Sequence, residues 1–338
     1  MVDISAVILT TDIDLEMLGE CIASVQDSSS SGDITTEIFV VDNASKTRVS
    51  DWVASHFPDV TVLRFDSTVS FSAGNNAGYR LSHGRYLLQL NNDTKIHGNA
   101  LRLMVDFMDA HLDAGALGPR LMNADGTLQV GYYARAFPTF TYDFFHLFWI
   151  NRAFPNNPSL RNQMLLGDPD VTREVDEPAG ASLFYRREVL FSINLLDNDY
   201  SFAFDDVDTC FRIRRAGWKI FYLKEAEVTH YGGASLGKSP ADMTSYYLNG
   251  LLTFYRKNRS GPISFLMRLT VIAAILFRIP IIFVVTYIMG KKRWRGNISS
   301  YLRSLPLVIS SLATGWTAQT FPVIEPEMVA HGSLRDVQ

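Results

Sequence analysis

The sequence predicts an α/β protein: a mostly parallel β-sheet flanked by helices, followed by a helical C-terminal region. Two observations lead to this class. Over roughly the first 120 residues, apolar runs typical of strands alternate with segments of helical periodicity, the pattern of a parallel sheet with helices on both faces. Beyond residue 235 the strand-like runs give way to apolar segments of helical length.

Composition limits the function classes. The chain has 338 residues, 47% of them hydrophobic, which is enough for a sizeable core. A net charge of -4 gives no reason to expect nucleic acid as a partner. Two cysteines, Cys21 and Cys210, are too few for a disulfide framework or a cysteine zinc site, so a reducing compartment is expected. The apolar start, residues 1–9, lacks a basic region and resembles a strand rather than a signal peptide.

The N-terminal elements follow one another in a regular order. Residues 4–10 form the first predicted strand, and apolar residues at helical spacing come next, with Asp14 as the predicted N-cap. The second strand, 37–41, closes in the turn-favouring run Asp42-Asn43-Ala44-Ser45. A third strand covers 60–65. The turn after each strand would lie at the carboxyl edge of the sheet, where ligands bind.

Two further polar segments belong to this edge. Residues 70–78 are rich in small side chains and are predicted to be a loop entering a helix, where backbone N–H groups can face phosphate. The fourth strand, 85–90, ends in Asn91-Asn92-Asp93. Such a run is often only a turn or a helix cap. Because it shares the edge with the other turns, a site for a nucleotide and a hard cation such as Mg²⁺ or Mn²⁺ is favoured.

The middle of the chain has a weaker pattern. Asp125-Gly126 indicates a tight turn, and residues 137–154 hold a dense group of aromatic side chains. Packing in a core or an interface is the favoured interpretation of this group, and an acceptor groove is the alternative.

A second acidic cluster opens a predicted helix with Asp205, Asp206 and Asp208. Asp208 with Arg212 is an ordinary i,i+4 ion pair. Two adjacent carboxylates at 205 and 206 repel each other, which requires a neighbouring cation or a raised pKa. Strands at 218–223 and 227–230 follow. The second of them ends in His230, for which a structural role and a metal or phosphate role are both open.

These segments together resemble the inverting family 2 glycosyltransferases of GT-A type, especially the bacterial branch that includes rhamnosyltransferases. The resemblance covers about residues 4–235, and its motifs keep the family's order. They are Val7-Ile8-Leu9-Thr10-Thr11, Val40-Val41-Asp42-Asn43-Ala44-Ser45, Phe71-Ser72-Ala73-Gly74-Asn75-Asn76, Leu90-Asn91-Asn92-Asp93-Thr94, Gly180-Ala181-Ser182-Leu183, Phe204-Asp205-Asp206-Val207-Asp208 and His230-Tyr231-Gly232-Gly233.

The resemblance implies a nucleotide-sugar donor, a divalent metal (Mg²⁺ or Mn²⁺) and a role for each matching position. It implies Asp206 as the general base, Asp205 where many relatives carry Glu, and Asp93 and His230 as metal ligands. Thr10 and Asp42 would contact the base and ribose. The implied nucleotide-sugar contacts are Thr10, Thr11, Asp42, Asn43, Asn75, Asn91, Asn92, Asp93, Gly180 and Ala181.

The chain departs from the family pattern at two places. Asn91 is neutral where the fuller Asp-x-Asp motif has a carboxylate, and Thr11-Asp12 replaces the usual Tyr-Asn. The chemistry still suits the residues present: a metal neutralises the departing diphosphate, and a carboxylate takes the proton of the acceptor hydroxyl. A single displacement of this kind inverts the anomeric centre.

The implied domains are a catalytic unit at 1–235 and a helical region at 236–338 with a membrane-interface segment at 262–295. Residues 269–289 are long enough to cross a bilayer. Arg278 near the middle and basic clusters at both ends favour a segment in the cytoplasmic interface, or a re-entrant hairpin broken at Pro280. A true span, and a soluble core or dimer helix, are the alternatives. We therefore expect the protein at the cytoplasmic face of the cell membrane.

The predicted activity is transfer of a sugar to a hydroxyl of a lipid-linked cell-envelope glycan, with L-rhamnose from dTDP-rhamnose as the leading donor. Another sugar, such as galactofuranose or a hexose from UDP, is the nearest alternative. A non-catalytic sugar-nucleotide-binding relative is favoured only by Asn91. A dinucleotide-binding oxidoreductase is opposed by the lack of G-x-G-x-x-G after the first strand. A homodimer is also compatible with the sequence.

Overall fold

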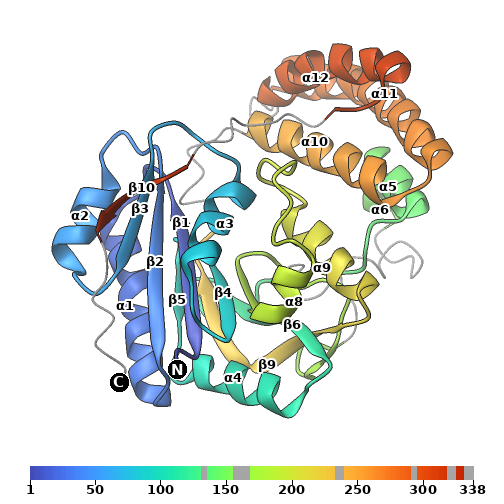
Figure 1. The fold of residues 1–338 in the computed structure, drawn as a ribbon. Coiled ribbons are helices and arrows are strands. Elements are labelled where there is room, and N and C mark those ends of the chain that lie inside the picture. The colour runs from blue at the N-terminus through green and yellow to red at the C-terminus, as the bar shows by residue number, and fades with distance from the viewer. Residues whose placement is uncertain (131–134, 155–167, 233–239, 291–294, 318–324, 331–338) are drawn as a thin grey trace.

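A mixed sheet in the order β10-β3-β2-β1-β4-β8-β6-β9-β5, with β7 beside β9, forms the centre of the molecule (Figure 1). The computed structural model describes residues 1–130, 135–154, 168–232, 240–290, 295–317 and 325–330. Parallel pairing is concentrated in the N-terminal half, whose strands are β1 (Ile4–Thr10), β2 (Thr36–Asn43), β3 (Thr61–Phe65) and β4 (Tyr86–Asn91). The predicted α/β class is confirmed.

The parallel strands are buried on both faces because helices cover each side. The helices α1 (Leu15–Gly32), α2 (Val49–His56) and α4 (Ala100–Ala110) share one hydrophobic cluster with alternate residues of β1. On the other face lie α3 (Phe71–Leu81), α8 (Arg187–Ser192) and α9 (Asp205–Arg215). Asp14 caps α1 as predicted, since its carboxylate accepts the N–H groups of Glu16 and Met17.

The second half of the sheet is built from distant parts of the chain. Its strands are β5 (Thr94–Ile96), β6 (Ala114–Met122), β7 (Arg173–Glu174), β8 (Ser182–Arg186) and β9 (Lys219–His230). β8 runs antiparallel to β4, and β9 runs parallel to β6 and antiparallel to β5. The two strands expected at 218–223 and 227–230 are therefore one strand, β9, with a register shift against β6.

The small-residue segment 70–78 is helical and not a loop, so that expectation is wrong. Ser70 is the N-cap of α3, and its hydroxyl accepts the N–H of Ala73 at 3.1 Å. Gly74 and Gly78 face β1 so closely that a Cβ on Gly74 would lie 2.4 Å from Cδ1 of Leu9. The small side chains allow the helix to pack directly on the strand.

The C-terminal helices form a separate layer at one end of the sheet (Figure 1). This layer contains α10 (Pro240–Asn258), α11 (Gly261–Phe283), the π-helix η1 (Val284–Ile288) and α12 (Arg295–Thr314). They share a third hydrophobic cluster with α5 (Phe140–Leu147) and residues next to α6 (Ile150–Ala153). A last strand, β10 (Glu327–Ala330), returns to the sheet and pairs antiparallel with β3.

The apolar C-terminal segment is a continuous helix through Pro280, so the expected break there is wrong. One helical segment, Gly261–Ile288, is long and apolar enough to cross a membrane. Arg278 is buried inside the helical layer, where its guanidinium donates to the carbonyls of His146 and Leu147 and to the Tyr301 hydroxyl. The charge that was expected to resist insertion therefore caps the C-terminal end of α5.

The basic residues before this helix also have partners within the protein. Arg256 donates to Asp199 at 2.8 Å, and Lys257 forms ion pairs with Asp197 and Asp199. Of the basic cluster after the helix, residues 291–293 lie outside the described part of the chain. Residues 233–235 of the glycine-containing segment after His230 also lie outside it.

Candidate active site

A cavity of about 740 Å³ opens at the carboxyl ends of β1, β2 and β4 and extends to α5 and α10. Its size falls in the range of small-molecule and cofactor sites. Eleven of the thirteen residues implied by the resemblance line it. They are Thr10, Thr11, Asn43, Asn91, Asn92, Asp93, Gly180, Ala181, Asp205, Asp206 and His230.

Asp42 and Asn75 do not line the cavity, and the structure shows why. The buried Asp42 carboxylate accepts the N–H groups of Ser45 at 2.8 Å and Ser50 at 3.0 Å, and it pairs with Arg64. These bonds fix the turn after β2 and the start of α2. The side chain of Asn75 is buried in α3 and donates to the carbonyl of Phe71. Both side chains bond within the protein here, and their contacts with a nucleotide sugar stay a prediction.

Strand pairing brings Asp93 and His230 together. Thr94 of β5 lies opposite His230 of β9, and the Tyr231 N–H donates to the Asp93 carbonyl at 2.9 Å. As a result Nε2 of His230 lies 3.5 Å from Oδ1 of Asp93. Gln129 holds the ring from the other side, with its Oε1 2.9 Å from Nδ1. Two segments more than 130 residues apart in sequence thus meet as an acidic and an imidazole group.

These two side chains fit a divalent cation. Oδ1 of Asp93 is buried, and it has no hydrogen-bond partner among the described residues. An unpaired buried carboxylate oxygen facing an imidazole nitrogen is the arrangement that a cation would complete. The described residues contain no cluster of three acidic, histidine or cysteine ligands. The remaining ligands would have to come from Asn91, water or the substrate's phosphates.

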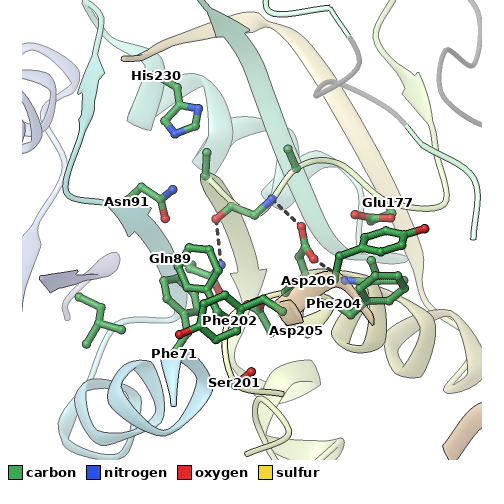
Figure 2. Close-up of a pocket in the computed structure, with 18 of the residues that line it drawn as sticks. Phe71, Gln89, Asn91, Glu177, Ser201, Phe202, Phe204, Asp205, Asp206 and His230 are labelled. Carbon is green, nitrogen blue, oxygen red and sulfur yellow. Dashed lines mark hydrogen bonds between the residues drawn. The ribbon is translucent and has the colours of Figure 1, made fainter. Parts of the chain in front are cut away.

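The second acidic cluster faces the cavity from the start of α9 (Figure 2). Oδ2 of Asp206 accepts the Gly180 N–H at 3.0 Å and Nη2 of Arg135 at 3.0 Å. Asp205 is buried beside it, and burial, followed by the charge of Asp206, raises the pKa of the Asp205 carboxyl well above its usual range. The repulsion between these adjacent carboxylates is thus relieved in both expected ways: by a neighbouring cation, Arg135, and by the raised pKa of Asp205.

Asp208 has the structural role that its spacing predicted. Its carboxylate accepts Nε of Arg212 at 2.6 Å and the Tyr200 hydroxyl at 3.0 Å, and it is buried. It ties α9 to the neighbouring loop and does not line the cavity.

Two charged residues on the cavity wall were not expected from the sequence, Arg135 and Glu177. They form an ion pair, and their backbones exchange hydrogen bonds in both directions. Neither residue belongs to a recognisable motif, and 42 positions separate them. The acidic pair Asp176-Glu177 before Gly180 is the sequence feature that could have indicated Glu177.

The far side of the cavity is aromatic. Phe202, Phe204, Tyr246 and Tyr247 contribute to it, together with Tyr142 and His146 from α5. Phe137, Phe140, Phe148 and Trp149 of the aromatic group at 137–154 pack in or against the third hydrophobic cluster, the favoured interpretation. Tyr142 and His146 line the cavity instead, and an acceptor groove there stays a prediction.

The chain is thus a mixed α/β protein whose ligand cavity lies at its strand ends and holds a carboxylate–imidazole pair and a second carboxylate. Residues 5–168 match the family model described as "Glycosyl transferase family 2". The chain contains a family 2 domain and is a glycosyltransferase.

Similar proteins agree with this class. The N-acetylglucosaminyl-diphospho-decaprenol L-rhamnosyltransferase of Mycobacterium tuberculosis is 28% identical over 229 residues, which are 60% of this chain and 72% of that protein. The mannosyltransferase PcManGT from Pyrobaculum calidifontis, solved with GDP-Man and Mn²⁺, aligns with a TM-score of 0.51 at 13% identity over 91% of this chain and 86% of its own. GalNAc-T7, solved with UDP, GalNAc and Mn²⁺, aligns with a TM-score of 0.51 at 14% identity over 92% and 58%. The two solved structures share the GT-A fold with this chain.

Proposed function

We propose that this glycosyltransferase moves a sugar, with inversion, from a nucleoside diphosphate to a hydroxyl of a lipid-linked cell-envelope glycan. The observation that supports the proposal most is that Asp93, His230 and Asp206 line one cavity although they are far apart in sequence. Leaving-group stabilisation and proton removal need groups on two sides of the same reacting carbon, and the cavity offers both.

Asp93 and His230 would hold the divalent cation, Mg²⁺ or Mn²⁺. When bound, such an ion supplies Lewis-acid neutralisation of the charge that develops on the departing diphosphate. Thr10, Thr11 and Asn43 line the end of the cavity beside β1 and β2, where the nucleoside would bind. Asn92 supports this end, because its amide donates to the Thr10 hydroxyl at 2.9 Å.

Asp206 would act as the general base. Its carboxylate is held by the Gly180 N–H and by Arg135, so its oxygens have a fixed position on the cavity wall. The acceptor hydroxyl would lose its proton to this carboxylate as its oxygen attacks the anomeric carbon. The aromatic far side would receive the acceptor sugar, since aromatic rings pack well on the apolar faces of sugars.

The leading donor is dTDP-L-rhamnose, and the support for it is the relative named as an L-rhamnosyltransferase. That relative's name also contains a decaprenol-linked diphosphate, which supports a lipid-linked acceptor. UDP-galactofuranose or a UDP-hexose is the second candidate. A non-catalytic sugar-nucleotide-binding relative is disfavoured, because Asp93, Asp206 and His230 are all present in the cavity.

A lipid-linked acceptor requires contact with the membrane, and the helical layer offers a surface for it. The large apolar side chains of α11 that are exposed are Ile263, Phe265, Leu266, Leu269, Leu276, Phe277, Ile281 and Phe283. We propose attachment at the cytoplasmic face through this surface. The region from 236 on would be membrane-associated, except for β10, which pairs with β3 in the sheet of the proposed catalytic unit 1–235.

The catalytic assignment is tested by Asp206→Asn. We expect transfer from dTDP-rhamnose to fall by about 10²–10⁴-fold, because the amide cannot accept the proton, while the donor still binds. Donor binding is read from the rise in melting temperature with the nucleotide sugar and Mn²⁺. The matched control is Asp113→Asn, which removes a surface ion pair with Lys219. Near-normal turnover in Asp206→Asn would rule out this base.

The same thermal-shift measurement decides the donor. Sugars carried by dTDP, UDP and GDP are compared with and without Mn²⁺, since a ligand of the folded state raises stability with its occupancy. We expect the dTDP sugar to give the largest shift and Asp93→Asn to lose its Mn²⁺-dependent part. A UDP sugar that shifts the wild type more would replace rhamnose as the donor.

A further inference from the structure

Glu177 is a buried carboxyl on the wall of the cavity, 2% exposed, just before the Gly180 turn. Its backbone is fixed to Arg135 in both directions: the Arg135 N–H donates to the Glu177 carbonyl at 2.8 Å, and the reverse bond is 3.2 Å. These two backbone bonds hold the segment that carries Arg135 beside the segment that carries Glu177.

Arg135 connects Glu177 to Asp206. Its Nη2 atom pairs with Oε1 of Glu177 and also donates to Oδ2 of Asp206 at 3.0 Å. One guanidinium nitrogen therefore serves two carboxyl groups at once. Figure 2 shows Glu177 and Asp206 side by side on the wall opposite His230. Any charge that Arg135 shares with Glu177 is no longer available to stabilise an ionised Asp206.

Several other titratable groups lie near Asp206 or Arg135. Burial raises the pKa values of Asp205, Tyr185 and Cys210 well above their usual ranges. Tyr142 and Tyr247, which face Arg135, also have pKa values raised by burial. Burial raises the pKa of Glu177 to about 8, against the opposing effect of Arg135. Burial also raises the pKa of Asp143 on the cavity wall, to about 7, but that carboxyl bonds to the Tyr255 hydroxyl. Glu177 is the titrating carboxyl that shares a nitrogen of Arg135 with Asp206.

We propose that Glu177, acting through Arg135, is a positioning residue that sets the strength of Asp206 as a base. The proposal rests on the role of Asp206 given above. When Glu177 is protonated, the guanidinium charge acts on Asp206 alone and makes it a weaker base. When Glu177 is ionised, it shares that charge, and Asp206 accepts a proton more readily.

The proton balance involves one group only. The acceptor hydroxyl gives its proton to Asp206, from which it passes to solvent after product leaves. Arg135 stays protonated throughout, and Glu177 takes no proton from the substrate. Transfer should thus show an upper step in its pH profile, as Glu177 ionises.

The test is the pH profile of kcat in Glu177→Gln. Glutamine keeps the shape and can accept from Arg135, but it cannot ionise. We expect the variant to match wild type below neutral pH and to lack the upper step, so that it is about three- to tenfold slower above pH 8. Glu174→Gln, which removes an ion pair with Arg214 outside the cavity, is the matched control and should keep the upper step.

A second variant tests the connection between the two carboxyls. In Arg135→Gln the guanidinium that joins Glu177 to Asp206 is lost, so the upper step should disappear. If Glu177→Gln only lowers the melting temperature and keeps the upper step, the residue is merely structural and the proposal is overturned. If Glu177→Gln does not fold, an upper step that persists in Arg135→Gln overturns it. Activity remaining in Asp206→Asn would instead refute the base itself.

Discussion

At the scale of single residues, the carboxyl groups around the cavity differ in what compensates their burial. Asp42 has a guanidinium and backbone N–H groups, whereas Asp143 on α5 has the Tyr255 hydroxyl at 2.6 Å. A hydroxyl compensates burial less than a charge does. Burial accordingly raises the pKa of Asp143 to about 7.

This raised pKa predicts a pH-dependent stability. A group whose folded pKa exceeds its unfolded value, here 3.8, stabilises the fold fully below that value and loses the contribution as pH rises through about 7. Asp143→Asn stays neutral and can still accept the Tyr255 hydroxyl. Its melting temperature should therefore equal the wild-type value near pH 4 and exceed it by several degrees at pH 8.

Melting curves of both proteins between these pH values check the prediction. Asp125→Asn serves as the control, because Asp125 lies in an exposed turn and its hydrogen bonds to Thr127 lower its pKa. This control should lose stability at neutral pH. A difference between Asp143→Asn and wild type that stays constant with pH would show that Asp143 is ionised in the fold.

Some site residues could be predicted from the sequence because local pattern identifies them. Asp93 and His230 each follow a strand, and Asp206 opens a helix, so their elements could be placed before the structure was known. Arg135 and Glu177 meet only through folding of distant segments. Asp42 has a turn-like sequence that is compatible with either a ligand or a cap, and its bond to Arg64, 22 positions away, could not be predicted from that sequence.

At the scale of elements, α3 shows how packing overrides local preference. Its sequence, with glycine and asparagine in the middle, is a poor helix former and was expected to begin as a loop. Contact with β1 stabilises the helix, because the absence of side chains at Gly74 and Gly78 lets the backbone approach Leu9 and Val7. Single-sequence periodicity does not contain this information.

The close approach of α3 to β1 predicts the effect of Gly74→Ala. Alanine is a better helix former, yet its Cβ would lie 2.4 Å from Leu9, which also lines the cavity. We expect a net loss of about 1–3 kcal/mol from overpacking, together with weaker donor binding as Leu9 shifts. Urea denaturation measures the first effect and thermal shift the second.

Gly261→Ala is the matched control for this change. A Cβ at Gly261 meets no atom within 4 Å, and the position opens α11. It should be neutral or slightly stabilising. Gly74→Ala with unchanged stability would mean that Leu9 moves aside without cost.

At the scale of the whole molecule, the exposed side of α11 predicts attachment to membranes. Leu276 and Phe283 are both more than half exposed, so a charge there should cost little folding stability. The double variant Leu276→Glu with Phe283→Glu should lose most binding to vesicles that contain anionic phospholipid, because each glutamate opposes both apolar burial and the surface potential.

Vesicle co-sedimentation of the full chain measures this binding. Leu112→Glu is the control, since Leu112 is an exposed apolar residue after α4 and outside the helical layer. It should bind vesicles as wild type does. Wild-type protein that stays in the supernatant with such vesicles would contradict the proposed attachment.

The whole fold was predictable only in its N-terminal half. There β1, β2 and β3 pair in chain order, and the helices between them carry clear periodicity. The other half depends on pairing between segments such as β5 and β9, which lie more than 120 residues apart. The return of β10 to β3 follows the helical layer, and no pattern in those four residues identifies the partner.

That returning strand bears on how the protein should be produced. Because β10 covers the free side of β3, a truncation after α12 would leave a row of unpaired backbone groups open to another copy, which is a route to aggregation. A fusion placed at the carboxyl terminus would follow a strand of the catalytic sheet, whereas one at the amino terminus would precede β1, which is paired on both sides by β2 and β4. Affinity tags therefore belong at the amino terminus.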